Sequence, residues 1–360
     1  MITNNYFIYT HNQLTTAAGK STWSAPSNIA LVKYWGKKEN QIPANPSLSF
    51  TLNNCKTITS VAYEPTTDNG TFQFDFLFEN KPKEDFKPKI NTFFKRIESY
   101  CPYLKNFHFT INSQNTFPHS SGIASSASGM SALAMNIMSL EKRLNPNMSD
   151  AYFYEKASFL ARLGSGSACR SVKGNVVVWG KQQDIPESSD LFGVSFPFPM
   201  HPVFNNFQDT ILLVDKGEKQ VSSTLGHDLM HNHPFAAQRF EQAHVNLTQL
   251  KNILETGNLT EFIALVESEA LTLHAMMLTS MPYFILMKPN TLQIINKIWE
   301  FRKATNTPVC FTLDAGANVH VLYPEANKET VLHFIETELA AFCQNKQFIV
   351  DYMGNGAEEL

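Results

Sequence analysis

The sequence predicts an α+β protein with two domains, for three reasons. At 360 residues the chain is longer than one ordinary domain. Its first third is rich in runs where apolar and polar residues alternate, and its second half alternates strand patterns with longer helical patterns. We therefore place the first domain at residues 1–200, with a polar leader at 1–20, and the second at 201–360.

Composition narrows the class of protein. Apolar residues make up 43% of the chain and charged residues 17%, which is enough apolar material for a core and excludes general disorder. With 29 Lys+Arg against 32 Asp+Glu, the chain lacks the positive charge of a dedicated nucleic-acid binder. There is neither an apolar run of membrane-spanning length nor a secretory signal pattern, and the 5 dispersed cysteines include no C-x-x-C pair. We therefore expect a soluble cytoplasmic protein with reduced thiols and no membrane partner.

The expected elements of the first half follow from the alternation of residue types. Strands are expected at 48–52, 57–63, 70–78, 107–112 and 175–179. The turn-rich segment 64–70 predicts a hairpin between the second and third of these strands. Helices are expected at 91–100, 130–140 and 150–163, the last capped by Asp150.

The second half begins after a connecting segment at 181–208, which carries several prolines. A strand is expected at 210–215, and another ends at Leu313. Helices are expected at 233–255, 259–277, 290–305 and 328–345.

A run of small residues at 118–129 leads directly into an apolar helix. Such a loop lets backbone N–H groups approach an anion, and the helix N-terminus adds partial positive charge. Serine hydroxyls could also reach phosphate oxygens or a magnesium ion. The alternative is a flexible surface loop that happens to be rich in serine.

Two further segments place cations among apolar or small residues. In 25–37, Lys33 and Lys37 share a parity, so an extended chain would direct both to one side. In 164–171, Arg170 stands among small residues and could bind a carboxylate or phosphate with both arms of its guanidinium. The alternatives are an edge strand with solvated lysines and a tight turn with a surface arginine.

Asp314 begins a turn of small residues directly after the strand that ends at Leu313. A carboxylate at a strand end could orient a hydroxyl group or accept its proton. Asp-x-Gly is also an ordinary turn sequence, and taken alone it favours a turn.

The histidines and one nucleotide-like motif need separate interpretation. His227, His231 and His233 are close enough in sequence to suggest a metal site, but they favour the polar start of a helix. His274, in an apolar helix, is expected to be a partly buried histidine near the site. The segment 19–21 resembles the end of a Walker A motif, but the pattern lacks its first glycine and is rejected.

Taken together, these motifs resemble the diphosphomevalonate decarboxylases of the GHMP kinase superfamily, over nearly the whole chain from about residue 23 to 350. The motifs that carry the resemblance are 28–37, 122–129, 164–171, 221–224 and 312–316. The resemblance implies a two-domain GHMP kinase-like fold, with a β-rich N-terminal domain, a ferredoxin-like C-terminal domain and the active site in the cleft between them.

The resemblance also implies the reaction. ATP and Mg²⁺ would serve to phosphorylate the tertiary 3-hydroxyl of mevalonate 5-diphosphate. Loss of phosphate and CO2 would then give isopentenyl diphosphate, a step of isoprenoid biosynthesis by the mevalonate pathway. A small-molecule substrate, no nucleic-acid partner and a homodimer are implied as well.

Residue roles carry over by position in the motifs. Asp314 would orient or deprotonate the 3-hydroxyl, Lys33 would lie beside it, Arg170 would hold the substrate carboxylate, and Asn28 would be a polar partner in the same region. The residues implied in substrate binding are Tyr34, Lys37, Ser223 and Ala315. Those implied in holding ATP are Ser120, Gly122, Ser125, Ser126 and Ser128, with Ser126 also as the magnesium ligand.

Two departures from the family pattern bear on specificity. His119 stands in the serine-rich loop where many relatives have a smaller residue, and position 224 is a threonine where some bacterial relatives have an arginine. The second departure leaves a decarboxylase of mevalonate 5-phosphate as the nearest alternative. A kinase without decarboxylation is disfavoured because Asp314 and Lys33 are both present, and a non-catalytic nucleic-acid-binding module is disfavoured by the net charge of -3.

Overall fold

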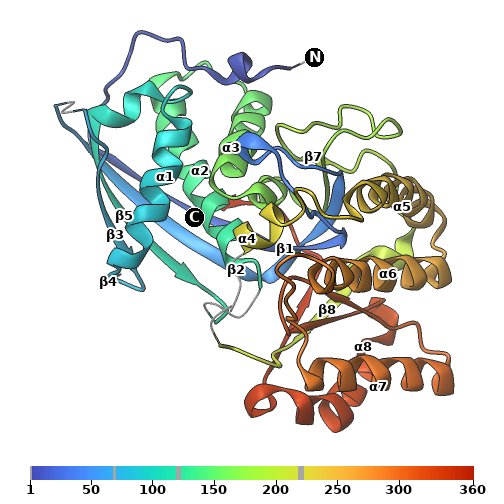
Figure 1. The fold of residues 1–360 in the computed structure, drawn as a ribbon. Coiled ribbons are helices and arrows are strands. Elements are labelled where there is room, and N and C mark those ends of the chain that lie inside the picture. Colours follow the sequence, from blue (N-terminus) through green and yellow to red (C-terminus); the bar gives the residue numbers. More distant parts are fainter. Residues whose placement is uncertain (1, 68–69, 119–122, 218–222) are drawn as a thin grey trace.

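The computed structural model describes residues 2–67, 70–118, 123–217 and 223–360. Within these residues the strands form an eight-stranded sheet and a four-stranded sheet, which meet near the middle of the molecule (Figure 1). None of the helices in the described part of the chain combines the length and apolar character that a membrane span requires.

The eight-stranded sheet is built mainly from the first half of the chain. Its strands are β1 (Gly19–Val32), β2 (Ser47–Pro65), β3 (Gln73–Phe78), β4 (Lys81–Pro82), β5 (Phe107–Asn115), β6 (Val176–Trp179), β7 (Val194–Ser195) and β12 (Glu358–Glu359). They run in the order β12-β1-β2-β5-β3-β4, and β6 pairs with β2 and β7. The strands expected at 48–52 and 57–63 are one continuous strand, β2.

The expected hairpin around 64–70 is wrong. Strand β5 lies between β2 and β3: Ile111 of β5 is the antiparallel partner of Val61 on one side and the parallel partner of Phe76 on the other. The turn-rich segment shows where the chain leaves β2, but it does not determine which strand becomes its neighbour. That choice depends on β5, which comes later in the sequence.

Helices α1 (Lys87–Ile97), α2 (Ser125–Leu144) and α3 (Asp150–Gly164) pack together beside this sheet (Figure 1). Helix α2 begins at Ser125, earlier than the apolar periodicity alone indicates, so part of the serine-rich loop is helical. The N-cap of α3 is Ser149, whose hydroxyl accepts a hydrogen bond from the Tyr152 N–H at 3.3 Å, and not Asp150 as expected.

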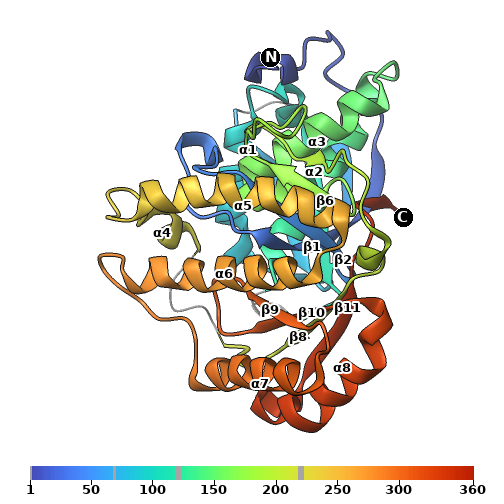
Figure 2. The same cartoon turned by 90° about the vertical axis from the view of Figure 1, so that its right-hand side faces the viewer.

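The four-stranded sheet is formed by the second half of the chain. Its strands are β8 (Gln208–Leu212), β9 (Cys310–Leu313), β10 (Val319–Tyr323) and β11 (Phe348–Tyr352), in the antiparallel order β11-β8-β10-β9. The helices of this half are α4 (Ser223–Asp228), α5 (Ala236–Thr256), α6 (Leu259–Leu278), α7 (Pro289–Thr305) and α8 (Lys328–Phe334). Figure 2 shows α6 between α5 and this sheet, with α7 and α8 on the other side of the sheet.

The two sheets are joined by a buried carboxylate. Asp351 of β11 is fully buried and accepts the backbone N–H groups of Asn53, Asn54 and Cys55 at 2.8–2.9 Å, all of them on β2. These donors lie at a transition along β2. Before them every residue of the strand is buried, and after them buried residues alternate with more exposed ones. A carboxylate with several N–H partners is well compensated for its burial, so this contact fixes the two halves relative to each other.

The leader at 1–20 buries aromatic side chains, although its composition is largely polar. Phe7 is completely buried and stacks on Phe159 of α3, with ring centroids 4.3 Å apart. Tyr9 is also buried and packs edge-to-face against Tyr103 at 5.1 Å. The leader therefore contributes to the core of the first half.

This packing predicts that Phe7→Ala will lower the free energy of unfolding by about 3 kcal/mol, because the substitution leaves a cavity among aromatic rings. Ile8→Ala is the matched control, since the neighbouring Ile8 side chain is exposed and its loss should cost less than about 0.5 kcal/mol. Urea unfolding followed by fluorescence measures both values. Equal small losses for the two variants would show that the leader does not stabilise the fold.

Candidate active site

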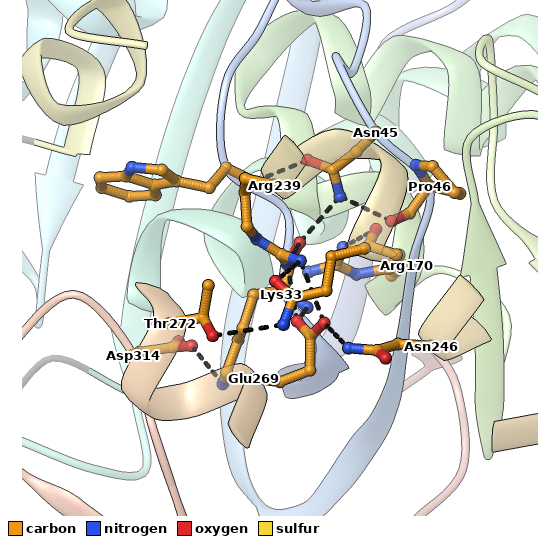
Figure 3. A network of polar contacts seen from close by, with 12 residues as sticks. Lys33, Asn45, Pro46, Arg170, Arg239, Asn246, Glu269, Thr272 and Asp314 are labelled. Atoms are coloured by element: carbon orange, nitrogen blue, oxygen red, sulfur yellow. Dashed lines mark hydrogen bonds and ion pairs between the residues drawn. The ribbon is translucent and has the colours of Figure 1, made fainter. Parts of the chain in front are cut away.

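The candidate site forms where the residue after β1 meets the turn after β9. Figure 3 shows its polar side chains. Lys33 directly follows β1 and is only 1% exposed, and Asp314 directly follows β9. The Lys33 Nζ atom lies 3.3 Å from Asp314 Oδ1. The two residues predicted to act together are therefore in contact, although they come from different sheets.

Burial and nearby charges set the protonation of Lys33. Burial lowers the pKa of Lys33, and this effect is partly opposed by the carboxylates of Asp314 and Glu269. Arg170 acts in the same direction as burial. A buried titratable group whose pKa is shifted by specific charged partners is typical of a catalytic site.

His274 of α6 supports the turn that carries Asp314. Its Nε2 atom is 3.2 Å from the Asp314 carbonyl oxygen, and because a carbonyl can only accept, Nε2 carries the proton. Burial lowers the pKa of His274 to about 4, so the ring is neutral near pH 7. His274 was expected to be partly buried near the site, and it is almost completely buried, with its contact holding the backbone next to the Asp314 carboxylate.

Arg170 lies close to this pair and is itself 3% exposed. Its Nε–H donates to Asn28 Oδ1 at 3.3 Å, and its Nη1–H donates to Ser47 Oγ. Asn28 in turn donates to Ser171 Oγ at 2.8 Å. The structure thus brings Asn28 and Arg170 together as predicted, and it adds Ser47. Nothing in the sequence distinguished Ser47 from the other hydroxyl residues of this strand.

The segment after Lys33 is not the extended strand that the parity of Lys33 and Lys37 assumed. Strand β1 ends at Val32, so alternation along a strand does not decide where Lys37 points. The Lys37 Nζ atom instead lies 3.4 Å from Asp228 Oδ1, on α4. The Tyr34 ring packs against Trp179 at 4.6 Å, and its hydroxyl is buried with no hydrogen-bond partner among the described residues.

The three neighbouring histidines contact this segment and α6 and do not share a metal. His227 Nδ1 accepts the Gly36 N–H at 3.0 Å, His231 Nε2 is 3.1 Å from the Lys37 carbonyl oxygen, and His233 Nε2 is 3.1 Å from the Met276 carbonyl oxygen. Burial lowers the pKa of His227 to about 3, so this histidine stays neutral. Across the described ranges, no group of His, Cys, Asp and Glu side chains is placed to hold a metal ion.

The first turn of α2 opens onto a cavity of about 280 Å³. Ser125 and Ser126 belong to its polar lining, and most of the exposed lining surface is apolar or aromatic. The apolar lining residues are Phe76, Phe78, Phe86, Ile90, Ile111, Met130 and Leu133. A helix N-terminus next to an apolar cavity fits a nucleotide, with phosphates at the helix end and the base in the cavity.

Ser128 does not line this cavity, although it was predicted with the others. It is fully buried, and its Oγ lies 2.6 Å from Thr57 Oγ1. Its hydroxyl is directed to β2, whereas Ser125 and Ser126 line the cavity. Ser128 therefore attaches α2 to β2.

The remaining predicted residues are placed only in part. Ser120 and Gly122, with His119, lie outside the described residues. Ser223 begins α4, but its side chain is also outside the description. Ala315 lies next to Asp314 and packs against the cluster that includes Trp35.

A fully buried ion pair in contact with Lys33 was not predicted (Figure 3). Arg239 of α5 and Glu269 of α6 are joined by an Nη2–Oε2 contact of 2.6 Å. The Glu269 Oε2 atom also accepts the Lys33 N–H at 2.8 Å, and the Arg239 Nη2 group donates to the Lys33 carbonyl oxygen at 3.1 Å. The one signal in the sequence was a carboxylate, Glu269, within the largely apolar helix expected at 259–277.

Comparison with known proteins identifies the family of both halves of the chain. Residues 25–191 match the family model of the diphosphomevalonate decarboxylase-like N-terminal domain, and residues 210–358 match that of the mevalonate 5-diphosphate decarboxylase C-terminal domain. A diphosphomevalonate decarboxylase of Debaryomyces hansenii is 32% identical over 329 residues, which cover 88% of this chain and 82% of the relative.

Solved structures give the same result. The crystal structure of mevalonate diphosphate decarboxylase from Staphylococcus aureus has a TM-score of 0.80 at 27% identity, covering 95% of this chain and 98% of that one. A structure described as MDDEF in complex with MVAPP, AMPPCP and magnesium has a TM-score of 0.81 at 29% identity, covering 96% and 99%. The expected GHMP kinase-like α+β fold is confirmed, and the chain belongs to the diphosphomevalonate decarboxylase family.

Proposed function

We propose that this chain catalyses the ATP-dependent decarboxylation of mevalonate 5-diphosphate to isopentenyl diphosphate, with Mg²⁺ as the metal. Membership of the family supports the reaction, and the related complex with MVAPP, AMPPCP and magnesium supports the ligands. The observation that carries the proposal is the contact between Lys33 and Asp314 beside a buried Arg170. This arrangement provides a carboxylate, an ammonium and a guanidinium at one point.

The first chemical step needs a hydroxyl to attack a phosphorus atom. Asp314 would orient the tertiary 3-hydroxyl and accept its proton. Lys33 lies 3.3 Å from that carboxylate, so its positive charge would offset the negative charge that develops during phosphoryl transfer. Phosphorylation turns a poor leaving group into a good one.

The second step breaks two bonds and forms a double bond. When the carbon–oxygen bond at carbon 3 breaks, its electron pair leaves with phosphate and positive charge develops at that carbon. The electron pair of the bond between the carboxylate carbon and carbon 2 then forms the new double bond, and CO2 departs. Arg170, oriented by Asn28 and Ser47, would hold the substrate carboxylate until that bond breaks.

ATP and the diphosphate of the substrate would lie on either side of Lys33, Asp314 and Arg170. In the cavity at the start of α2, Ser125 and Ser126 would bind the phosphates of ATP, with Ser126 reaching Mg²⁺. Bound ATP and Mg²⁺ supply the transferred phosphoryl group and neutralise its charge. Tyr34, Lys37, Ser223 and Ala315 are the proposed substrate-binding residues, with the first three around the diphosphate.

Further parts of the proposal concern the whole molecule. We place the border between the two domains near residue 200, between the family-model matches that end at 191 and begin at 210.

A cytoplasmic location is consistent with the 5 cysteines, which are all buried free thiols. A homodimer is consistent with the exposed apolar side chains of Met281, Tyr283 and Ile285 after α6.

Product analysis tests the reaction directly. The chain is incubated with ATP and Mg²⁺, and with mevalonate 5-diphosphate and mevalonate 5-phosphate in separate assays. We expect isopentenyl diphosphate and CO2 from the diphosphate alone. Isopentenyl phosphate and CO2 from the monophosphate would mean that the substrate is wrong, and ADP without CO2 would mean that the chain is a kinase.

Asp314→Asn should lower kcat by roughly 10³-fold with little change in KM, because it removes the proposed proton acceptor and leaves the substrate-binding groups in place. Asp150→Asn is the control, since that carboxylate is exposed at the start of α3. Steady-state CO2 release measures both. A raised KM with normal kcat for the Asp314 variant would contradict the assigned role.

Ser47→Ala should lower kcat/KM about tenfold, because it removes a hydrogen-bond partner of the buried Arg170 guanidinium. Strand β2 offers a matched control: Ser49 is equally buried on the same face, and its Oγ has no partner among the described residues. Ser49→Ala should therefore leave kcat/KM near its normal value. The same loss in both variants would show that Arg170 does not depend on Ser47.

A further inference from the structure

We propose that Glu269 and Arg239 are positioning residues for Lys33, which hold both backbone polar groups of that residue and so fix its ammonium at Asp314. The inference rests on the proposed function and deepens it, because it explains how the second half of the chain sets the catalytic geometry of the first. Neither residue is proposed to touch the substrate.

The need for such support arises where β1 ends. Lys33 lies one residue beyond the strand, so the ladder to β2 no longer provides partners for its backbone, and the residue is almost completely buried. Buried N–H and C=O groups need partners. Here the N–H donates to Glu269 Oε2 at 2.8 Å, and the carbonyl oxygen accepts from Arg239 Nη2 at 3.1 Å.

The ion pair is itself held rigidly. Arg239 binds Glu269 through both of its terminal nitrogens, at 3.1 Å to Oε1 and 2.6 Å to Oε2. The Asn246 amide donates to Oε1 at 2.6 Å, so both carboxylate oxygens are engaged. Two-point contact between a planar guanidinium and a carboxylate fixes orientation as well as distance.

A third contact comes from the first half of the chain. The Asn45 amide group donates to the Lys33 carbonyl oxygen at 2.9 Å, and the Asn45 side-chain oxygen accepts the Trp35 N–H at 3.4 Å. The Lys33 carbonyl is therefore shared between Asn45 and Arg239. Figure 3 shows these contacts converging on Lys33 from several elements.

Stability alone does not account for this arrangement. Burying two charges is costly, and a buried ion pair is often no more stabilising than apolar side chains of similar volume. The Arg239–Glu269 pair is fully buried, yet it directs one contact to each backbone polar group of the same catalytic lysine. A role in positioning Lys33 explains why the ion pair lies at this place.

The Glu269 carboxylate also influences the charge of Lys33. It is one of the groups that favour the ammonium form, whereas burial and Arg170 oppose it. The titratable or charged groups near Lys33 on the elements around it are Asp314, Glu269, Arg239, Arg170, His274 and Asp209. Replacing Glu269 by a neutral residue leaves Arg239 unbalanced, so the pKa of Lys33 should fall further and the ammonium should be lost at lower pH.

Glu269→Gln keeps the size of the side chain and removes its charge. We expect kcat to fall between ten- and a hundredfold at nearly unchanged KM, because Lys33 is displaced. We also expect the alkaline limb of the kcat–pH profile to move to lower pH by about one unit. NMR titration of ¹³C-labelled lysine, with Lys33 assigned by its loss in Lys33→Met, should show the same shift without any turnover.

Glu141→Gln is the matched control. Glu141 forms an equally buried ion pair with Lys156, at 2.7 Å, among the helices beside the large sheet. This variant should lose stability but keep the kcat and alkaline limb of the unmodified chain. If Glu269→Gln fails to fold, Asn246→Ala takes its place. It removes one of the two donors to Oε1 and leaves Arg239 and both charges, and it should lower kcat without moving the alkaline limb of the kcat–pH profile.

The outcomes are separable. A Glu269→Gln enzyme with the kcat, alkaline limb and Lys33 titration of the Glu141→Gln control would overturn the positioning role, as would unchanged kcat in Asn246→Ala. An unmodified chain that releases no CO2 would instead contradict the proposed function. In that case the NMR titration alone still decides whether Glu269 controls Lys33.

Discussion

The structure depends on keeping one ammonium group charged in a place that water hardly reaches. A buried lysine loses hydration and tends to lose its proton, unless nearby groups compensate for that loss. Lys33 is compensated by Asp314 at 3.3 Å and by the carboxylate of Glu269 at its own N–H. Because these two partners come from the second half of the chain and Lys33 from the first, the reactive centre exists only when both halves are in place.

The fold holds Lys33 against these partners because its two sheets are joined at fixed points. Asp351 attaches β11 to the backbone of β2, and α6 contributes both Glu269 and His274 to the junction. One residue of α6 thus holds Lys33 and the other holds the carbonyl of Asp314. The two members of the catalytic pair are therefore positioned by the same helix, which ties their separation to the rigidity of that helix.

The sequence predicted those features that depend on residues close together in the chain. The end of β9 at Leu313 and the carboxylate that follows it were visible because alternation stops and small residues begin. Ser47 and Arg239 could not be found in this way, because their importance comes from partners far away in the chain. Likewise, β5 separates β2 from β3 only through pairing with a later segment, and Phe7 is buried only because α3 offers an aromatic surface.

The central claim is that Lys33, Asp314 and Arg170 surround the reacting part of mevalonate 5-diphosphate. A crystal structure of this chain with that compound bound tests it most directly. The account predicts the 3-hydroxyl within hydrogen-bond distance of Asp314 and next to Lys33 Nζ, with the carboxylate on the Arg170 guanidinium. A bound molecule whose carboxylate or hydroxyl lies elsewhere, with Arg170 still directed only to Asn28 and Ser47, would contradict it.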